Sequence, residues 1–428
     1  MMAPELPSSS PASIEAQFGR SETEPPVCST WRNPRLAGRI RELDGIRGLA
    51  ILLVLIQHYV LDAAIVHTPG WKSHILALFR LAWSGVDLFF VLSGFLIGGI
   101  LIDAKKAENY YQTFYMRRFH RIVPLYYLWL ALFCVGVYFF GDAKSQFLLL
   151  LFKRNSIPFW TYPLFVQNIA MAFQGGIGPL WLGITWSLAV EEQFYVLLPL
   201  AIRQWSLKGI LRLVCCAIIA APVIRIVMLR LGSGPLAPYT LLPCRADALG
   251  FGVLVAILVR SEIVWAWLKS HRKQIVLAFL LLGVGIFRLL FIREPFRNPL
   301  FVCFGYSLIA AFYAALVLLV IVNPGRVEKL VFGWSPLVKL GIVAYAVYVF
   351  HQGVNFLWHG AVFGKIPSVN DWPAILLTLI SLATVLLLAE ISWRVMERPL
   401  IQHAHSRYRY STAPPQHPPL LISSPRLL

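Results

Sequence analysis

Long apolar segments make up most of this chain, and short polar stretches separate them. A helix needs about 20 mainly apolar residues to cross the roughly 30 Å hydrocarbon core of a bilayer. Segments near that length predict about ten transmembrane helices and an all-α fold. They lie at 48–66, 78–102, 122–140, 186–203, 209–231, 245–260, 274–292, 299–322, 339–360 and 373–395.

The composition agrees with a polytopic integral membrane protein. Of the 428 residues, 58% are hydrophobic and 14% are charged, whereas soluble domains have roughly 25% charged residues. The composition excludes a disordered chain, a nucleic-acid-binding domain and an ordinary cytosolic enzyme as descriptions of the whole chain. The cysteines show no spacing typical of a zinc site or a disulfide framework, so no metal is expected.

The distribution of basic residues predicts the topology. The chain has 38 Lys and Arg against 20 Asp and Glu, and the basic residues cluster in short loops, as in cytoplasmic loops of membrane proteins. Segment 145–173 is apolar but is interrupted by charged residues and prolines. If it crossed the membrane, three later basic loops would lie outside. We therefore interpret 145–173 as an outer re-entrant or interfacial segment and place both termini in the cytoplasm.

The two ends of the chain differ from the apolar region. Residues 1–36 are rich in Pro and Ser and predict a disordered cytoplasmic tail. Residues 401–428 contain several prolines and histidines and predict a second disordered cytoplasmic tail. The transmembrane domain is expected to span 37–400.

Ionisable residues within apolar spans are costly, so each is a candidate for function. Arg47 and His58 are eleven residues apart, which places both on one helix face about 16 Å apart. This spacing predicts Arg47 at the cytoplasmic rim and His58 near mid-membrane. The alternative for His58 is a packing hydrogen bond to a neighbouring helix.

A second basic cluster opens the third predicted span. Arg117, Arg118 and Arg121 lie within five residues, and guanidinium groups bind phosphate bidentately. The cluster predicts a phosphate-bearing ligand at the inner face. Positive-inside anchoring with lipid headgroups is an equally good explanation at this point.

Two adjacent carboxylates, Glu191 and Glu192, lie about two turns into a further apolar segment. Glu191 shares a helix face with Ser187 and Tyr195, whereas Glu192 points about 100° away. We expect Glu191 roughly 5–10 Å above His58 if the two helices are antiparallel, and Glu192 in a structural pair with a basic residue. Further polar candidates in or beside the spans are Asp44, Asp87, Ser187, Tyr348 and His351.

Together these motifs resemble the membrane-bound acyltransferase-3 family, whose members O-acylate sugars, polysaccharides and antibiotics. The resemblance covers about residues 40–400. Its motifs are Arg47-x10-His58, the segments 85–97, 114–124 and 186–199, the region 345–351 with Ala344 in place of the family's serine, and Glu397-Arg398-Pro399 with Arg in place of Lys.

The resemblance implies transfer of an acyl group, commonly acetyl from cytoplasmic acetyl-CoA, to a hydroxyl group. The acceptor would be a glycan, a glycolipid or a macrolide-like molecule. Acyl-CoA is expected as a donor substrate and not as a permanently bound cofactor. The expected location is the inner (plasma) membrane, and no nucleic-acid partner is expected.

The same resemblance implies roles for the candidate residues. His58 would act as base or acyl carrier, with Glu191 and Glu192 as further catalytic candidates. Arg47, Arg117, Arg118 and Arg121 would bind the phosphates of acyl-CoA. A multi-span transporter of a small anionic or glycan-related solute is the alternative, because such proteins also carry buried Arg, His and Glu.

Overall fold

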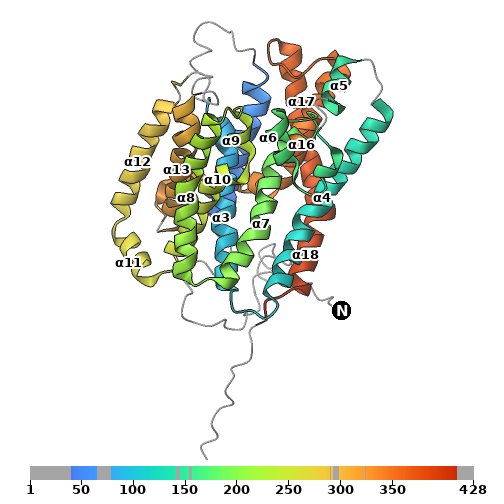
Figure 1. Cartoon of the computed structure of the whole chain (residues 1–428). Coiled ribbons are helices and arrows are strands. Elements are labelled where there is room, and N and C mark those ends of the chain that lie inside the picture. Colours follow the sequence, from blue (N-terminus) through green and yellow to red (C-terminus); the bar gives the residue numbers. More distant parts are fainter. Residues whose placement is uncertain are drawn as a thin grey trace, which may run out of the picture.

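A computed structural model describes residues 40–64, 79–140, 145–153, 157–289, 291–292, 298–322 and 324–411. These residues form helices and no strands, as the apolar pattern predicted. Most long helices run alongside one another between two ends of a bundle (Figure 1). The predicted tail 1–36 lies outside the described residues.

The long helices of the first half are α1 (Arg41–Ile56), which continues as a π-helical turn (Gln57–Leu61), α3 (Gly85–Asp103), α4 (Tyr110–Phe140), α7 (Trp186–Gln204) and α8 (Leu207–Arg230). Those of the second half are α10 (Leu242–Leu258), α12 (Arg272–Leu289), α13 (Tyr306–Ile321), α16 (Ala344–Phe363) and α17 (Trp372–Ser392). Shorter helices are α5 (Gln146–Phe152), α6 (Gln167–Gln174), α9 (Leu236–Thr240), α11 (Glu262–Ser270), α14 (Arg326–Phe332), α15 (Ser335–Ile342) and α18 (Arg398–Arg407).

Within the described residues, seven helices are long and apolar enough to cross a membrane, and the bent pair α15 and α16 makes an eighth, with 77° between its parts. The predicted count of about ten is not reached on length and composition. The two remaining predicted spans correspond to α7 and α12, which have 19 and 18 residues, so that almost the whole of each helix would lie within the bilayer together with its charges. Each carries three charged residues: Glu191, Glu192 and Arg203 in α7, and Arg272, Lys273 and Arg288 in α12.

Segment 145–173 contains no long helix among its described residues. It forms the short helices α5 and α6, which lie near the end of the bundle where α4 ends and α17 begins (Figure 1). At the other end, the predicted boundary at residue 400 falls inside α18, which continues to Arg407 and packs on α4. The rest of the predicted C-terminal tail beyond residue 411 lies outside the described residues.

The centre of the bundle holds two guanidinium groups that are wholly buried. Arg225 on α8 donates to Asp247 on α10 at 2.9 Å and to Ser307 on α13 at 2.7 Å. Arg245 on α10 forms an ion pair with Asp87 on α3. Breaking a buried pair by removing one partner leaves a charge without compensation, so these contacts tie α3, α8, α10 and α13 together. Asp87, a candidate site residue, is therefore a partner of Arg245.

Close approach of helix backbones shapes the rest of the bundle. A Cβ atom on Gly94 of α3 would overlap the carbonyl oxygen of Leu249 on α10, and one on Gly252 would overlap that of Val91. Such small residues let helices approach closely where water provides no driving force for association. Glycine is therefore required on both sides of the crossing between α3 and α10.

This crossing generates the first prediction. Gly252→Ala should lower the thermal unfolding midpoint of the detergent-solubilised protein, because the added methyl group overpacks a backbone contact at a cost of about 1–3 kcal/mol. Gly283→Ala on α12 is the matched control, since its Cβ would meet Phe312 at an ordinary 3.6 Å. Equal midpoints for the two variants would show that the crossing is not close-packed.

Candidate active site

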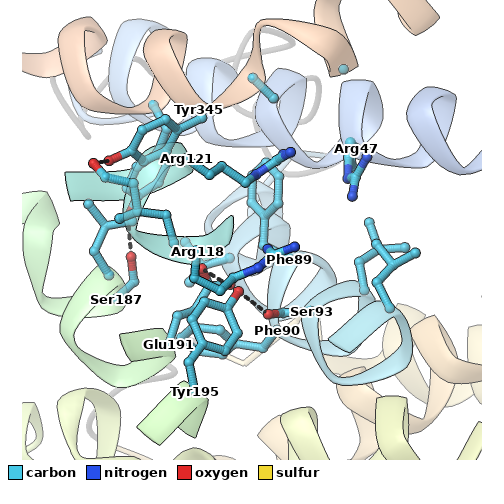
Figure 2. A pocket seen from close by; sticks show the side chains of 18 residues that line it. Arg47, Phe89, Phe90, Ser93, Arg118, Arg121, Ser187, Glu191, Tyr195 and Tyr345 are labelled. Atoms are coloured by element: carbon cyan, nitrogen blue, oxygen red, sulfur yellow. Dashed lines mark hydrogen bonds between the residues drawn. The ribbon is translucent and has the colours of Figure 1, made fainter. Parts of the chain in front are cut away.

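A cleft opens between α1, α3, α4, α7, α15 and α16, and three predicted arginines line it. Arg118 and Arg121 enter from α4, and Arg47 faces them from α1 (Figure 2). The space in the cleft, including its open mouth, is about 870 Å³. The apolar part of its lining comes from Val86, Phe89, Phe90, Leu92, Leu96, Ile122, Leu188 and Ala344.

The fourth predicted arginine is not part of this lining. Arg117 lies about 100° around α4 from Arg118. Its Nε donates to the carbonyl oxygen of Tyr408 at 2.8 Å, and its guanidinium lies 5.3 Å from the ring centre of Tyr410. The cluster therefore divides: two arginines serve the cleft and one anchors the segment after α18.

Neighbouring side chains contact two of the arginines in the cleft, Arg47 and Arg118. Arg47 donates to Asp44 one turn earlier at 3.0 Å, which gives Asp44, another candidate, a positioning contact. Arg118 lies 5.9 Å from the ring centre of Tyr195 on α7. The hydroxyl groups of Tyr195 and Ser93 are 2.5 Å apart, which joins α7 to α3 across the cleft (Figure 2).

The two adjacent carboxylates have different surroundings. Glu191 lines the cleft, where Tyr195 donates to its Oε2 at 3.5 Å. Glu192 does not line the cleft, and its buried Oε1 has no hydrogen-bond partner. Glu191 lies with Arg118 in the cleft, and His58 is not among the cleft residues; the expected separation of Glu191 and His58 stays a prediction.

Two hydroxyl groups mark another part of the cleft wall. Tyr348 on α16 and Ser187 on α7 lie 2.5 Å apart, and the Tyr348 hydroxyl donates to the carbonyl oxygen of Ile184 at 3.0 Å. Both were predicted candidates, and both line the cleft. The structure thus brings Arg47, Arg118, Arg121, Ser187, Glu191 and Tyr348 into one site.

His58 lies at a separate centre, close to the end of α1. The predicted span 48–66 put His58 at mid-membrane, but the helix begins at Arg41 and ends at Leu61. His58 is therefore three residues from the helix end. The spacing of about 16 Å from Arg47 stays a prediction from α-helical rise, and His58 itself lies in the π-helical turn.

Sequence analysis missed the partner of His58. Nδ1 of His58 lies 2.8 Å from Oδ2 of Asp62, and Gln57 donates to the other carboxylate oxygen at 2.7 Å. An Asp in this position holds Nδ1 as the donor and leaves Nε2 as the basic nitrogen. The spacing of four residues was visible, but Asp62 at the end of an apolar run is also typical of a boundary charge.

His351 lies beside His58 and connects the two centres. The ring centres of His58 and His351 are 5.1 Å apart, and those of His351 and Tyr348 are 5.7 Å apart. Nδ1 of His351 donates to the carbonyl oxygen of Tyr348 at 2.7 Å, and Nε2 has no partner. A row of three rings therefore leads from the cleft to the His58–Asp62 pair.

In the described part of the chain, no group of three or more His, Cys, Asp or Glu residues could hold a metal ion. The arrangement offers cationic groups for an anionic ligand, hydroxyl groups in an apolar wall, and a carboxylate-oriented imidazole. Acyl transfer to an alcohol needs a base near the hydroxyl proton and positive or hydrogen-bonding groups near developing negative charge.

Three known proteins to which this chain is similar are all named as O-acetyltransferases, one of them as putative. The peptidoglycan O-acetyltransferase OatA of Listeria monocytogenes is 25% identical over 86% of this chain and 57% of its own length. The O-acetyltransferase OatA of Staphylococcus aureus is 28% identical over 84% and 56%. The putative peptidoglycan O-acetyltransferase YrhL of Bacillus subtilis is 27% identical over 84% and 54%.

The chain thus spans little more than half the length of these curated relatives. No solved structure matches it. Residues 40–394, which contain the cleft, His58 and His351, match the acyltransferase domain. The chain therefore belongs to the acyltransferase-3 family.

Proposed function

We propose that this protein transfers an acyl group, acetyl in the simplest case, from acyl-CoA to a hydroxyl group of a glycan or related acceptor. The observation that carries the proposal is the cleft in which Arg47, Arg118 and Arg121 face one space together with Ser187 and Tyr348. Three guanidinium groups suit the phosphates of CoA. The apolar wall suits a thioester arm that must be shielded from water.

Charge supports an orientation for the donor. Basic residues follow the ends of α3 and α10, lie in the last turn of α7, and lie in the first turns of α8 and α12. All of these lie toward the end of the bundle where α4 begins (Figure 1). The positive-inside rule assigns that end to the cytoplasm, where acyl-CoA is made. In this proposal the protein resides in the plasma membrane and both termini are cytoplasmic. α7 and α12 also cross the bilayer, and 145–173 is an interfacial or re-entrant segment on the outer side.

The carboxylates of α7 take different parts in this proposal. Glu191 lines the cleft and interacts with Arg118 and Tyr195, so it orients the guanidinium that receives the donor. Glu192 lies outside the lining and interacts with Arg118 electrostatically. Glu192 therefore supports the position of Arg118 without touching substrate.

His58 performs the chemical step in this proposal. Its Nε2 removes the proton of the acceptor hydroxyl as the oxygen attacks the thioester carbon, the carbon–sulfur bond breaks, and the thiolate of CoA takes up the proton. In the alternative, the same nitrogen first accepts the acyl group and then passes it to the hydroxyl. Asp62 serves both routes, because it holds the ring and stabilises the imidazolium.

The acceptor class follows from the relatives. Two of the three are named as peptidoglycan O-acetyltransferases, one of them as putative. A hydroxyl-bearing glycan is accordingly the acceptor proposed for this chain, presented on the side of the membrane where His58 lies.

The second prediction concerns the donor. Arg118→Gln should raise the KM for acetyl-CoA at least tenfold, because a charge-assisted bond to phosphate contributes roughly 1.5–3 kcal/mol. Arg118→Lys should give a KM for acetyl-CoA between those of the wild type and Arg118→Gln, since an ammonium cannot make a bidentate contact. Arg117→Gln is the matched control from the same helix and should leave the KM unchanged. Initial rates in proteoliposomes measure both.

An equal rise in KM for Arg117→Gln and Arg118→Gln would assign the cluster to general surface charge. Unchanged values for both would remove the donor role of α4.

The third prediction concerns the histidine pair. His58→Ala should abolish transfer of labelled acetyl to soluble peptidoglycan fragments, and Asp62→Asn should lower kcat by about 10²-fold or more, because general acid–base catalysis contributes about 10²–10⁴-fold. Binding of acetyl-CoA should persist in both variants. Normal turnover by His58→Ala would refute the proposed step.

Incubation with labelled acetyl-CoA and no acceptor then separates the two routes. Label on the wild-type protein that hydroxylamine releases, and that is absent from His58→Ala, would establish the carrier route, because an acylated imidazole is readily cleaved by a nucleophile. Absence of label in both proteins would establish the base route.

A further inference from the structure

Buried hydrogen-bond acceptors without partners are concentrated around the outer part of α16. They belong to His351, Gln352, Asn355 and His359 on α16 and to Gln57 beside His58. His351, Asn355 and His359 are at most 3% exposed. Because an unpaired buried polar group costs about 1–3 kcal/mol, this concentration calls for a ligand or water that donates hydrogen bonds.

These residues form a stripe along the helix. Tyr348, Gln352, Asn355 and His359 follow one another at intervals of four, three and four residues, which places them on one face. The stripe is about 16 Å long. It starts at Tyr348 in the wall of the cleft. His351 lies beside the stripe on the same helix, and its ring contacts the ring of His58. We call it the α16 stripe.

The buried unpaired atoms of the α16 stripe, of His351 and of Gln57 are amide oxygens and imidazole nitrogens. Nε2 of His359 lies 3.0 Å from the hydroxyl oxygen of Thr378, whose proton is donated to Ala374. His359 must therefore donate through Nε2, which leaves Nδ1 as a free acceptor. His351 likewise donates through Nδ1 and keeps Nε2 free.

The amide of Gln57 is oriented by the same logic. Its nitrogen faces the carboxylate of Asp62, so Oε1 points away and remains unpaired. The buried oxygens of Gln352 and Asn355 also lack partners, and each of these side-chain amides can both accept and donate hydrogen bonds. A ligand that satisfies such a set must present several hydroxyl or amide protons along its length.

These properties exclude other ligand classes. An anion would be repelled by the carboxylate of Asp62, both of whose oxygens are already bound by Gln57 and His58. A single metal ion cannot be shared by His351 and His359, which are eight residues and about 12 Å apart along the helix, whereas metal–nitrogen bonds are about 2 Å long.

We propose that the α16 stripe binds the acceptor as a polyhydroxylated sugar, with one sugar hydroxyl group presented to Nε2 of His58. This inference rests on the proposed acyltransferase function and adds to it the acceptor site and its recognition chemistry. The sugar hydroxyls donate to the free acceptors of the stripe, and the reacting hydroxyl donates to His58 before its proton is removed.

The test compares acceptor and donor kinetics in full-length protein in proteoliposomes. Asn355→Leu and Gln352→Met remove one acceptor each and keep similar volume. Each should raise the KM for soluble peptidoglycan fragments about three- to tenfold, as expected for a lost neutral hydrogen bond. The KM for acetyl-CoA should stay unchanged.

Thr384→Val is the matched control on α17, because Thr384 bonds only Trp358 and Ile380 in the described structure. It should change neither KM. Gln352 is only partly buried, so Gln352→Met keeps the test valid if Asn355→Leu fails to fold.

An unchanged acceptor KM in the folded variants, with equal or higher thermal stability, would overturn the inference and leave water as the occupant of the α16 stripe. Failure of the proposed function looks different: the wild-type protein itself would then neither hydrolyse acetyl-CoA nor transfer its acetyl group.

Discussion

The arrangement of this protein depends on two fully buried arginines. Arg225 and Arg245 could not remain in an apolar bundle without Asp247 and Asp87, and these pairs determine how α8, α10 and α3 meet. α3 in turn forms one wall of the cleft through Phe89, Phe90 and Ser93. The two buried ion pairs thus position the cleft wall on α3, although their own side chains do not line the cleft.

Two sites result, and their chemistry is different. The cleft holds cationic groups and suits a phosphate-bearing donor, whereas the α16 stripe with Gln57 holds acceptors and suits a hydroxyl-bearing partner. Tyr348 belongs to both, since it lines the cleft and begins the stripe. The row of rings from Tyr348 through His351 to His58 connects the cleft with the stripe. In the proposed function the donor and the acceptor would meet along this row.

Sequence analysis predicted the helices and most of the arginine site because period and composition carry that information. The rise per residue alone separates Arg47 from His58, and an offset of one residue separates Arg117 from Arg118. His58 lies closer to the end of its helix than the apolar window 48–66 predicted, because the window does not show that α1 starts at Arg41 with Glu42 and Asp44 in its first turn.

Other features are contacts between distant segments, and single-sequence patterns do not contain them. The pairing of Arg245 with Asp87 and the approach of His351 to His58 join residues 158 and 293 positions apart in the chain. The π-helical turn that contains His58 and ends one residue before Asp62 has no distinctive sequence. The unpaired acceptors of the α16 stripe emerge only when all partners are known.

The most direct test of the central claim is the sidedness of the reaction. Proteoliposomes with the protein in one known orientation would receive membrane-impermeant acetyl-CoA on one side and soluble peptidoglycan fragments on the other. The account predicts labelled fragments only when acetyl-CoA faces the end of the bundle where α4 begins, with free CoA released on that same side. Labelled fragments formed only in the reverse arrangement, or only when both substrates share one side, would contradict it.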